Sequence, residues 1–317
     1  MALFFFRLLI LTLTKTKDNA MHNLRFWFDK ILMIVKKFLK NFMNKNGNLL
    51  KNGSKPKFSD AKFISLSLLA ENPMHYSENY LFKLFHKNCK KKFPNLIERS
   101  RFNRRSKNLY YLTEQLRSFL VESLLEGEYC FLIDPMPISI VCLARANLSR
   151  ISKEDIHTAS GKGYCVSQDQ FYDYKLHAVT SVNGVITRFD LSPTNVHDTE
   201  HLKQVRTNYP VYTILGDMAY LSDLLQLEHF ERNSITPMRR NQKNYRKQPA
   251  IFRYLEKSIK TVFFQFHDQF NIQKNYSKKF WRMATHILSK LTAFTLLQYM
   301  NKYEFHNKLN HVKQTLL

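Results

Sequence analysis

The pattern of apolar and polar positions divides the chain into a helical first part and a mixed second part. Residues 22–43 carry apolar side chains at helical spacing between lysines, which predicts a basic amphipathic helix. We expect this helix to pack on a core, although such a helix can also lie on a membrane or approach DNA. Residues 44–57, rich in Asn, Gly and Lys, read as a linker. Two or three short helices are predicted to follow, the first capped by Ser59 and the next by Ser77.

After residue 128 the pattern changes to short apolar runs that alternate with helical segments. A buried strand ending at Asp134 is predicted for YCFLID, and the pattern recurs with Asp217 in VYTILGD. Between them, two alternating segments flank Asn183-Gly184, a strong signal for a hairpin turn. We therefore expect an α/β domain preceded by a helical region.

Two helical patterns close the α/β part, one over residues 251–266 and one that starts at Trp281. Aromatic residues on mostly apolar helices are more often packing residues than binding residues. We therefore expect Trp281 in the helix core, together with Phe263, Phe264 and Phe266.

The composition points to a polyanionic partner. The 317 residues include 49 Lys and Arg against 25 Asp and Glu, a formal net charge of +24. Nucleic acid is the first candidate partner, and an anionic membrane surface is the second. Residues 87–107 hold nine Lys and Arg with one acid, and residues 236–260 hold eight with one acid. Neither GxGxxG nor GxxxxGK[ST] occurs, which argues against a glycine-rich phosphate-binding loop.

Cysteine spacing and hydropathy favour a reduced, cytoplasmic protein without stable membrane insertion. No two of the four cysteines are spaced as CxxC, which argues against a zinc module. No run reaches the roughly 18–20 apolar residues of a spanning helix, and Arg7 interrupts the apolar start. We interpret residues 1–20 as an extension outside the core, or as the product of a start codon assigned too early, with Met21 as the alternative start.

Asp134 and Asp217 are the first candidates for chemistry. For a single acid that follows a strand, a turn or a helix cap is the most frequent role. Two or three carboxylates that converge at the edge of a sheet can instead hold Mg²⁺, which prefers hard oxygen ligands and water. Two such ions can stabilise the attacking and leaving oxygens of a phosphoryl transfer.

Three motifs surround these acids, in this order: IDPMPISIVC, GYCVSQDQFYDYKLHAVTSVNGVITRFDLSPTNVHD and LGDMAYLSDLLQ. They resemble the catalytic core of bacterial insertion-sequence transposases of the DDE type. The resemblance extends over about residues 56–300, because FSDAKFISLSLLAE and FPNLIERSRFNRR are similar to the DNA-binding leader of that family. It implies an RNase H-like mixed sheet flanked by helices, two Mg²⁺ or Mn²⁺ ions, and cleavage and joining of transposon DNA ends.

The third acid of that family departs from the pattern. Asp134 and Asp217 match the first two catalytic and metal-binding acids, but the position of the family's Glu falls on Lys260 in SIKTVFFQF. The nearest acid is Glu256, one helical turn earlier, about 5.4 Å along the axis. Either Glu256 is the third catalytic and metal-binding residue, or the chain is a degenerate copy in which Glu256 and Lys260 form an i,i+4 ion pair.

The resemblance also implies the organisation and the partners of the chain. We expect an extension and linker over residues 1–55, a helical DNA-binding region over 56–127, an RNase H-like domain over 128–302 and a tail over 303–317. The expected partner is DNA, as terminal inverted repeats and target, bound by a homo-oligomer because two ends must be joined. An alternative is a protein that binds the element ends, cuts nothing and represses an active copy. The residues expected to contact DNA are Arg99, Arg101, Arg104, Arg105, Lys175, His177, Arg239, Arg240, Lys243 and Arg246.

Overall fold

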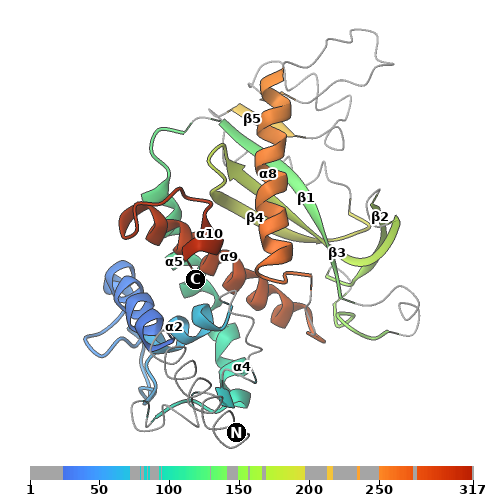
Figure 1. Cartoon of the computed structure of the whole chain (residues 1–317). Coiled ribbons are helices and arrows are strands. Elements are labelled where there is room, and N and C mark those ends of the chain that lie inside the picture. The colour runs from blue at the N-terminus through green and yellow to red at the C-terminus, as the bar shows by residue number, and fades with distance from the viewer. Residues whose placement is uncertain are drawn as a thin grey trace, which may run out of the picture. The chain divides into compact units, whose positions relative to one another are not determined.

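The structure is a computed structural model, shown in Figure 1. It describes residues 24–71, 79, 82–83, 85, 93, 95–128, 130–140, 149–155, 158–165, 169–196, 213–216, 234–235, 250–273 and 277–315. The chain divides into two compact units, Met1–Arg105 and Ser106–Leu317. Within the described ranges, no helix is both long enough and apolar enough to cross a membrane.

The first unit begins with a helix over residues 24–38, followed by a short 3-10 helix, η1 (Lys40–Phe42). One set of apolar positions of this helix is buried, with Phe28 and Val35 at most 1% exposed, whereas Phe26 and Met33 are 50% and 72% exposed. The Phe28 ring meets the rings of Phe85 and Phe93, with centroids 6.4 and 4.9 Å apart. The predicted amphipathic helix therefore packs on a core. Buried side chains of this core, such as Leu24 and Leu39, lie within residues 1–55, the range expected to be an extension and linker.

Helix α2 (Asp60–Ala70) begins where the sequence predicts. The Ser59 side chain accepts a hydrogen bond from the Lys62 backbone N–H at 3.4 Å, which confirms the cap. Helix α4 (Arg99–Asn108) follows and buries a single side chain, Phe102, whose ring lies 4.4 Å from that of Phe63 on α2. The boundary between the two units falls within α4.

A mixed sheet forms the centre of the second unit. Its strands follow the order β2-β3-β1-β5-β6, and β4 also pairs with β3. The β1–β3, β2–β3 and β3–β4 pairs are antiparallel, whereas β1–β5 and β5–β6 are parallel. This mixed sheet, flanked by helices, is consistent with an RNase H-like domain. The strands are β1 (Cys130–Ser139), β2 (Gly161–Cys165), β3 (Asp169–Ser181), β4 (Ile186–Pro193), β5 (Thr213–Gly216) and β6 (Ser234–Ile235).

Strand β1 continues beyond the acid at which the sequence predicts its end. Pairing with β3 runs from Phe131 to Ser139, and the described pairing with β5 runs from Cys130 to Ile133. The predicted strand is therefore present, but it ends at Ser139 and not at Asp134.

Helices α5 (Tyr110–Leu124), α8 (Ala250–Asp268) and α9 (Phe280–Tyr303) pack with this sheet. Figure 1 shows α8 lying across the sheet in front of β1, and Leu255 and Ile259 of α8 share one buried cluster with Leu132 of β1 and Leu215 of β5. Helix α9 is buried along most of its length. On α5, the buried Arg117 guanidinium donates to the backbone oxygens of Ile186 and Thr187 at 2.9 and 3.2 Å.

Residues near the end of the described chain form hydrogen bonds to the β3–β4 hairpin. Its turn lies at Asn183-Gly184, with Gly184 at φ +81°, which confirms the predicted hairpin. Asn310 donates to the Asn183 carbonyl oxygen at 2.9 Å, and Gln298 donates to that of Gly184 at 2.9 Å. Val312, the first residue of α10 (Val312–Thr315), is fully buried. This part of the expected tail is therefore packed within the second unit.

Candidate active site

Asp134 lies on the face of the sheet that α8 covers. It stands between Leu132 and Met136 on β1, and alternate residues of a strand share a face. Its side chain is half-buried, and its cross-strand neighbour on β3 is the fully buried Ala178. Leu132, two residues earlier on this face, packs against Leu255 and Ile259 of α8. The strand pairing therefore positions the backbone of Asp134, and its side chain is partly shielded from solvent.

The second predicted acid follows β5. Gly216 is the last residue of β5, and it pairs in parallel with Ile133, the residue before Asp134. Asp217 itself lies outside the described residues. The described register therefore pairs the residue before Asp134 with the residue before Asp217.

The two candidates for the third acidic position stand one turn apart on α8. Glu256 follows the buried Leu255 and is half-buried, whereas Lys260 follows the buried Ile259 and is exposed. Glu256 therefore lies closer to the packed face of the helix. The ion pair expected between Glu256 and Lys260 is not among those that join described residues.

Among the described residues, Asp134 is one candidate ligand for a divalent ion. The half-buried Asp134 carboxylate matches the preference of Mg²⁺ for hard oxygen ligands. Among the residues that the structure describes, no three His, Cys, Asp or Glu side chains come together as a metal site. A complete site therefore needs ligands beyond this described set, and Lys260 would bring a positive charge close to the same helix face.

Lys175 and His177 have partners within the protein. In the register of β3, they lie opposite Pro137 and Pro135 of β1, on the face of the sheet away from Asp134. His177 is buried, and its Nε2 lies 2.8 Å from the Ser192 hydroxyl oxygen. Lys175 donates to the Val196 carbonyl oxygen at 3.2 Å. Neither position places a positive group beside Asp134.

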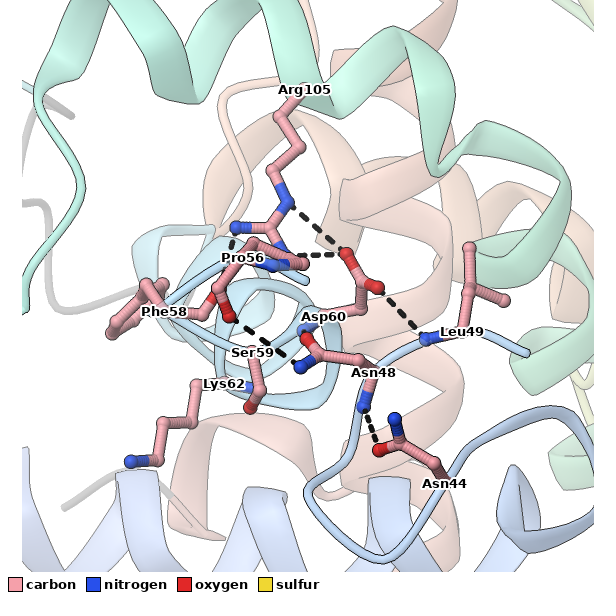
Figure 2. A network of polar contacts seen from close by, with 9 residues as sticks. All are labelled: Asn44, Asn48, Leu49, Pro56, Phe58, Ser59, Asp60, Lys62 and Arg105. Atoms are coloured by element: carbon pink, nitrogen blue, oxygen red, sulfur yellow. Dashed lines mark hydrogen bonds and ion pairs between the residues drawn. The ribbon is translucent and has the colours of Figure 1, made fainter. Parts of the chain in front are cut away.

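The four predicted arginines of α4 divide into two groups. Arg99, Arg101 and Arg104 are exposed. Arg105 turns inward, as Figure 2 shows, where its guanidinium forms an ion pair with Asp60 and donates to the Phe58 carbonyl oxygen at 2.6 Å. Arg105 therefore fixes α4 against the start of α2. The sequence showed only that four arginines are close together, and Asp60 lies 45 residues away.

Two aromatic predictions on the last helices are wrong. Trp281 is 51% exposed and Phe264 is 66% exposed, although both were expected in the helix core. Phe266 is fully buried, as predicted, and Phe263 is partly buried against the cluster around Leu132. Each of the helices α8 and α9 buries only part of its surface. The rings of Phe264 and Trp281 lie on the exposed part. The basic segment KKFWR around Trp281 is the one sequence signal that could have drawn attention to it.

The remaining predicted DNA contacts belong to the basic segment that precedes α8. These four residues lie outside the described part of the chain: Arg239, Arg240, Lys243 and Arg246.

Comparison with known families gives one match. Residues 128–278 match the family described as a transposase DDE domain. Searches of curated proteins and of solved structures gave no significant match. The matched range contains Asp134, β1 to β6 and α8, which together make the candidate site. Over residues 128–278 the resemblance seen in the motifs is therefore confirmed: this part of the chain is a transposase DDE domain.

Proposed function

We propose that the chain is a DNA transposase that cuts and joins the ends of its insertion sequence, as a weakly active, degenerate copy. The observation that carries this proposal is the match of residues 128–278 to the transposase DDE domain. The half-buried carboxylate of Asp134, next to the last described pair of β1 and β5, supports it.

Within this proposal, Asp134 and Asp217 are the first two catalytic carboxylates, and Glu256 stands in for the third. A pair of divalent ions bound there would supply charge neutralisation at the scissile phosphodiester and an activated water. The role of the protein is to position the three carboxylates, which lie on β1, after β5 and on α8. Because Glu256 stands one turn from the family position, and Lys260 occupies that position, we propose that cleavage is weak.

A second candidate function is DNA binding without cleavage. It is favoured by the exposed ammonium group of Lys260 at the position where the family carries a carboxylate. Such a protein would bind the element ends as a homo-oligomer and compete there with an active copy.

A cleavage assay on the purified full chain separates these two functions. The substrate is duplex DNA that contains the regions flanking the chain's own coding sequence. We expect slow nicking at one border with Mg²⁺ or Mn²⁺, and none after EDTA is added, because phosphoryl transfer there needs the ions. Specific binding with no nicking under any divalent ion would leave only the second candidate function.

The exposed arginines of α4 lead to a second expectation. Replacing Arg101 or Arg104 by Ala should weaken DNA binding about equally for all sequences. The slope of log affinity against log salt should fall by about 1 for each lost phosphate contact. Fluorescence anisotropy over a salt series measures both quantities. Lys45→Ala, an exposed lysine in the same unit, is the matched control. An unchanged slope for both arginine variants would remove α4 from the DNA surface.

A further inference from the structure

The start of α9 carries an exposed aromatic side chain among cations. Trp281 is 51% exposed, and Lys278, Lys279 and Arg282 beside it are exposed as well. The Lys107 ammonium lies 5.5 Å from the centre of the Trp281 ring, and the Tyr110 ring meets that ring edge-on at 6.3 Å. These six residues, Trp281, Tyr110, Lys107, Lys278, Lys279 and Arg282, are called the Trp281 patch below.

Packing underneath holds the Trp281 patch in place. The Phe280 ring meets the Trp281 ring at 6.0 Å and the ring of the fully buried Tyr174 at 5.6 Å. The Phe280 backbone N–H donates to the Glu154 carboxylate at 3.2 Å. The indole is therefore presented to solvent from a fixed base, and ordering it on binding costs little side-chain entropy.

The Trp281 patch contains four cations and no acid. The first turn of α9 contains no acidic residue. Glu154 accepts from the Phe280 backbone N–H, and Glu114 on α5 is paired with Arg117. Burial, Glu114 and Asp190 raise the pKa of Tyr110, so these acids act on the Tyr110 side of the patch. Four cations around an exposed indole complement a strand that carries both phosphates and bases.

The patch is connected to the candidate catalytic face through β1. Tyr174, beneath Phe280, pairs with Ile138, which is four residues beyond Asp134 on the same face of β1. Four residues of strand span about 13 Å. Ile138 and Tyr174 are both fully buried, so this connection runs through packed side chains and not along an open surface.

We propose that the Trp281 patch binds an unpaired DNA strand, with a base stacked on the Trp281 ring and phosphates held by Lys107, Lys278, Lys279 and Arg282. The identification of the polyanion as DNA rests on the proposed transposase function. The stacking itself rests on the exposure of the ring and its cationic surroundings. An unpaired base arises wherever a duplex end is opened for cutting or joining.

The two tryptophans of the chain make a direct test, because Trp27 is only 7% exposed whereas Trp281 is 51% exposed. Intrinsic fluorescence of the full chain is titrated with short single-stranded oligothymidylate, without divalent ions. We expect quenching in the parent and in Trp27→Phe, but not in Trp281→Phe. Trp281→Ala should lower the affinity for the oligonucleotide about five- to 150-fold, because stacking contributes about that much per base. Lys279→Ala should lower both the affinity and its salt dependence while the quenching at saturation stays the same.

Several results would overturn this proposal. Equal quenching by heparin, which has no bases, would mean that charge alone is recognised. Equal quenching by blunt duplex DNA would rule out an unpaired base, and clearly tighter binding of RNA than of DNA would identify a different partner. DNA cleavage by a chain that shows no quenching would remove this inference and leave the transposase function. Quenching by a chain that never cuts DNA would support this inference and contradict the transposase function.

Discussion

Replacing Lys260 by Glu is expected to raise divalent-ion-dependent DNA cleavage about a hundredfold or more. The change removes a positive charge from α8 and adds a hard oxygen ligand at the position where the family carries one, on a helix that packs over the face of Asp134. Lys260 is exposed, and Lys and Glu have similar helix propensities, so the fold should tolerate the change. The initial rate of border nicking, compared with that of the parent, measures the gain.

Two further variants separate this explanation from a general charge effect. Lys257→Glu makes the same charge reversal at another exposed position of α8, and we expect no gain from it. Adding Asp134→Asn to the Lys260→Glu chain should abolish the gained activity, because the half-buried carboxylate on β1 is lost. If Glu256→Ala alone abolishes cleavage in the parent and Lys260→Glu adds nothing, then Glu256 is the functional third acid and the copy is not degenerate.

Asp60→Ala is expected to lower the free energy of unfolding of the first unit by about 3–5 kcal/mol, because it leaves a largely buried guanidinium unpaired. The side chains of Asp60 and Arg105 are 2% and 14% exposed. The same carboxylate accepts from the Leu49 backbone N–H at 2.9 Å, so its loss also removes the acceptor of that N–H (Figure 2). Urea titration in a Trp281→Phe background measures the effect, since Trp27 then reports alone on this unit.

The chain offers a matched control for that measurement. Arg25 and Asp29 form the same type of pair on the outer face of the first helix, where their side chains are 50% and 55% exposed. Asp29→Ala should therefore cost less than about 1 kcal/mol. Combining Asp60→Ala with Arg105→Met should recover much of the lost stability, because no buried charge then lacks a partner. Equal small losses for Asp60→Ala and Asp29→Ala would show that the buried pair does not stabilise the fold.

Features set by local chemistry could be predicted from the sequence. The hairpin at Asn183-Gly184 needs only a turn that tolerates positive φ between two alternating segments. The start of α2 needs only Ser59 before an apolar run. The pattern around Asp134 gave the first candidate acid, because its surrounding motif is also local in the chain.

Features set by distant partners could not be predicted in the same way. The length of β1 depends on β3, which pairs with it as far as Ser139. Arg105 differs from Arg104 only because Asp60 lies within reach of one of them. The exposure of Trp281 depends on which faces α5 and α9 bury against each other. Neighbouring residues in sequence do not determine such contacts.

The hydrogen bond between Asn310 and the hairpin turn has a consequence for synthesis of the chain. Asn310, which donates to the Asn183 carbonyl oxygen, leaves the ribosome 127 residues after its partner. At about 5–20 residues per second, 127 residues take roughly 6–25 s, whereas a hairpin forms in about 1–10 μs. The hairpin turn therefore forms early, and the hydrogen bond from Asn310 to it forms only later. During this interval the nascent chain exposes the turn carbonyls and the apolar surface that Val312 will cover, so the ribosome-bound domain is the form most open to chaperones and proteases.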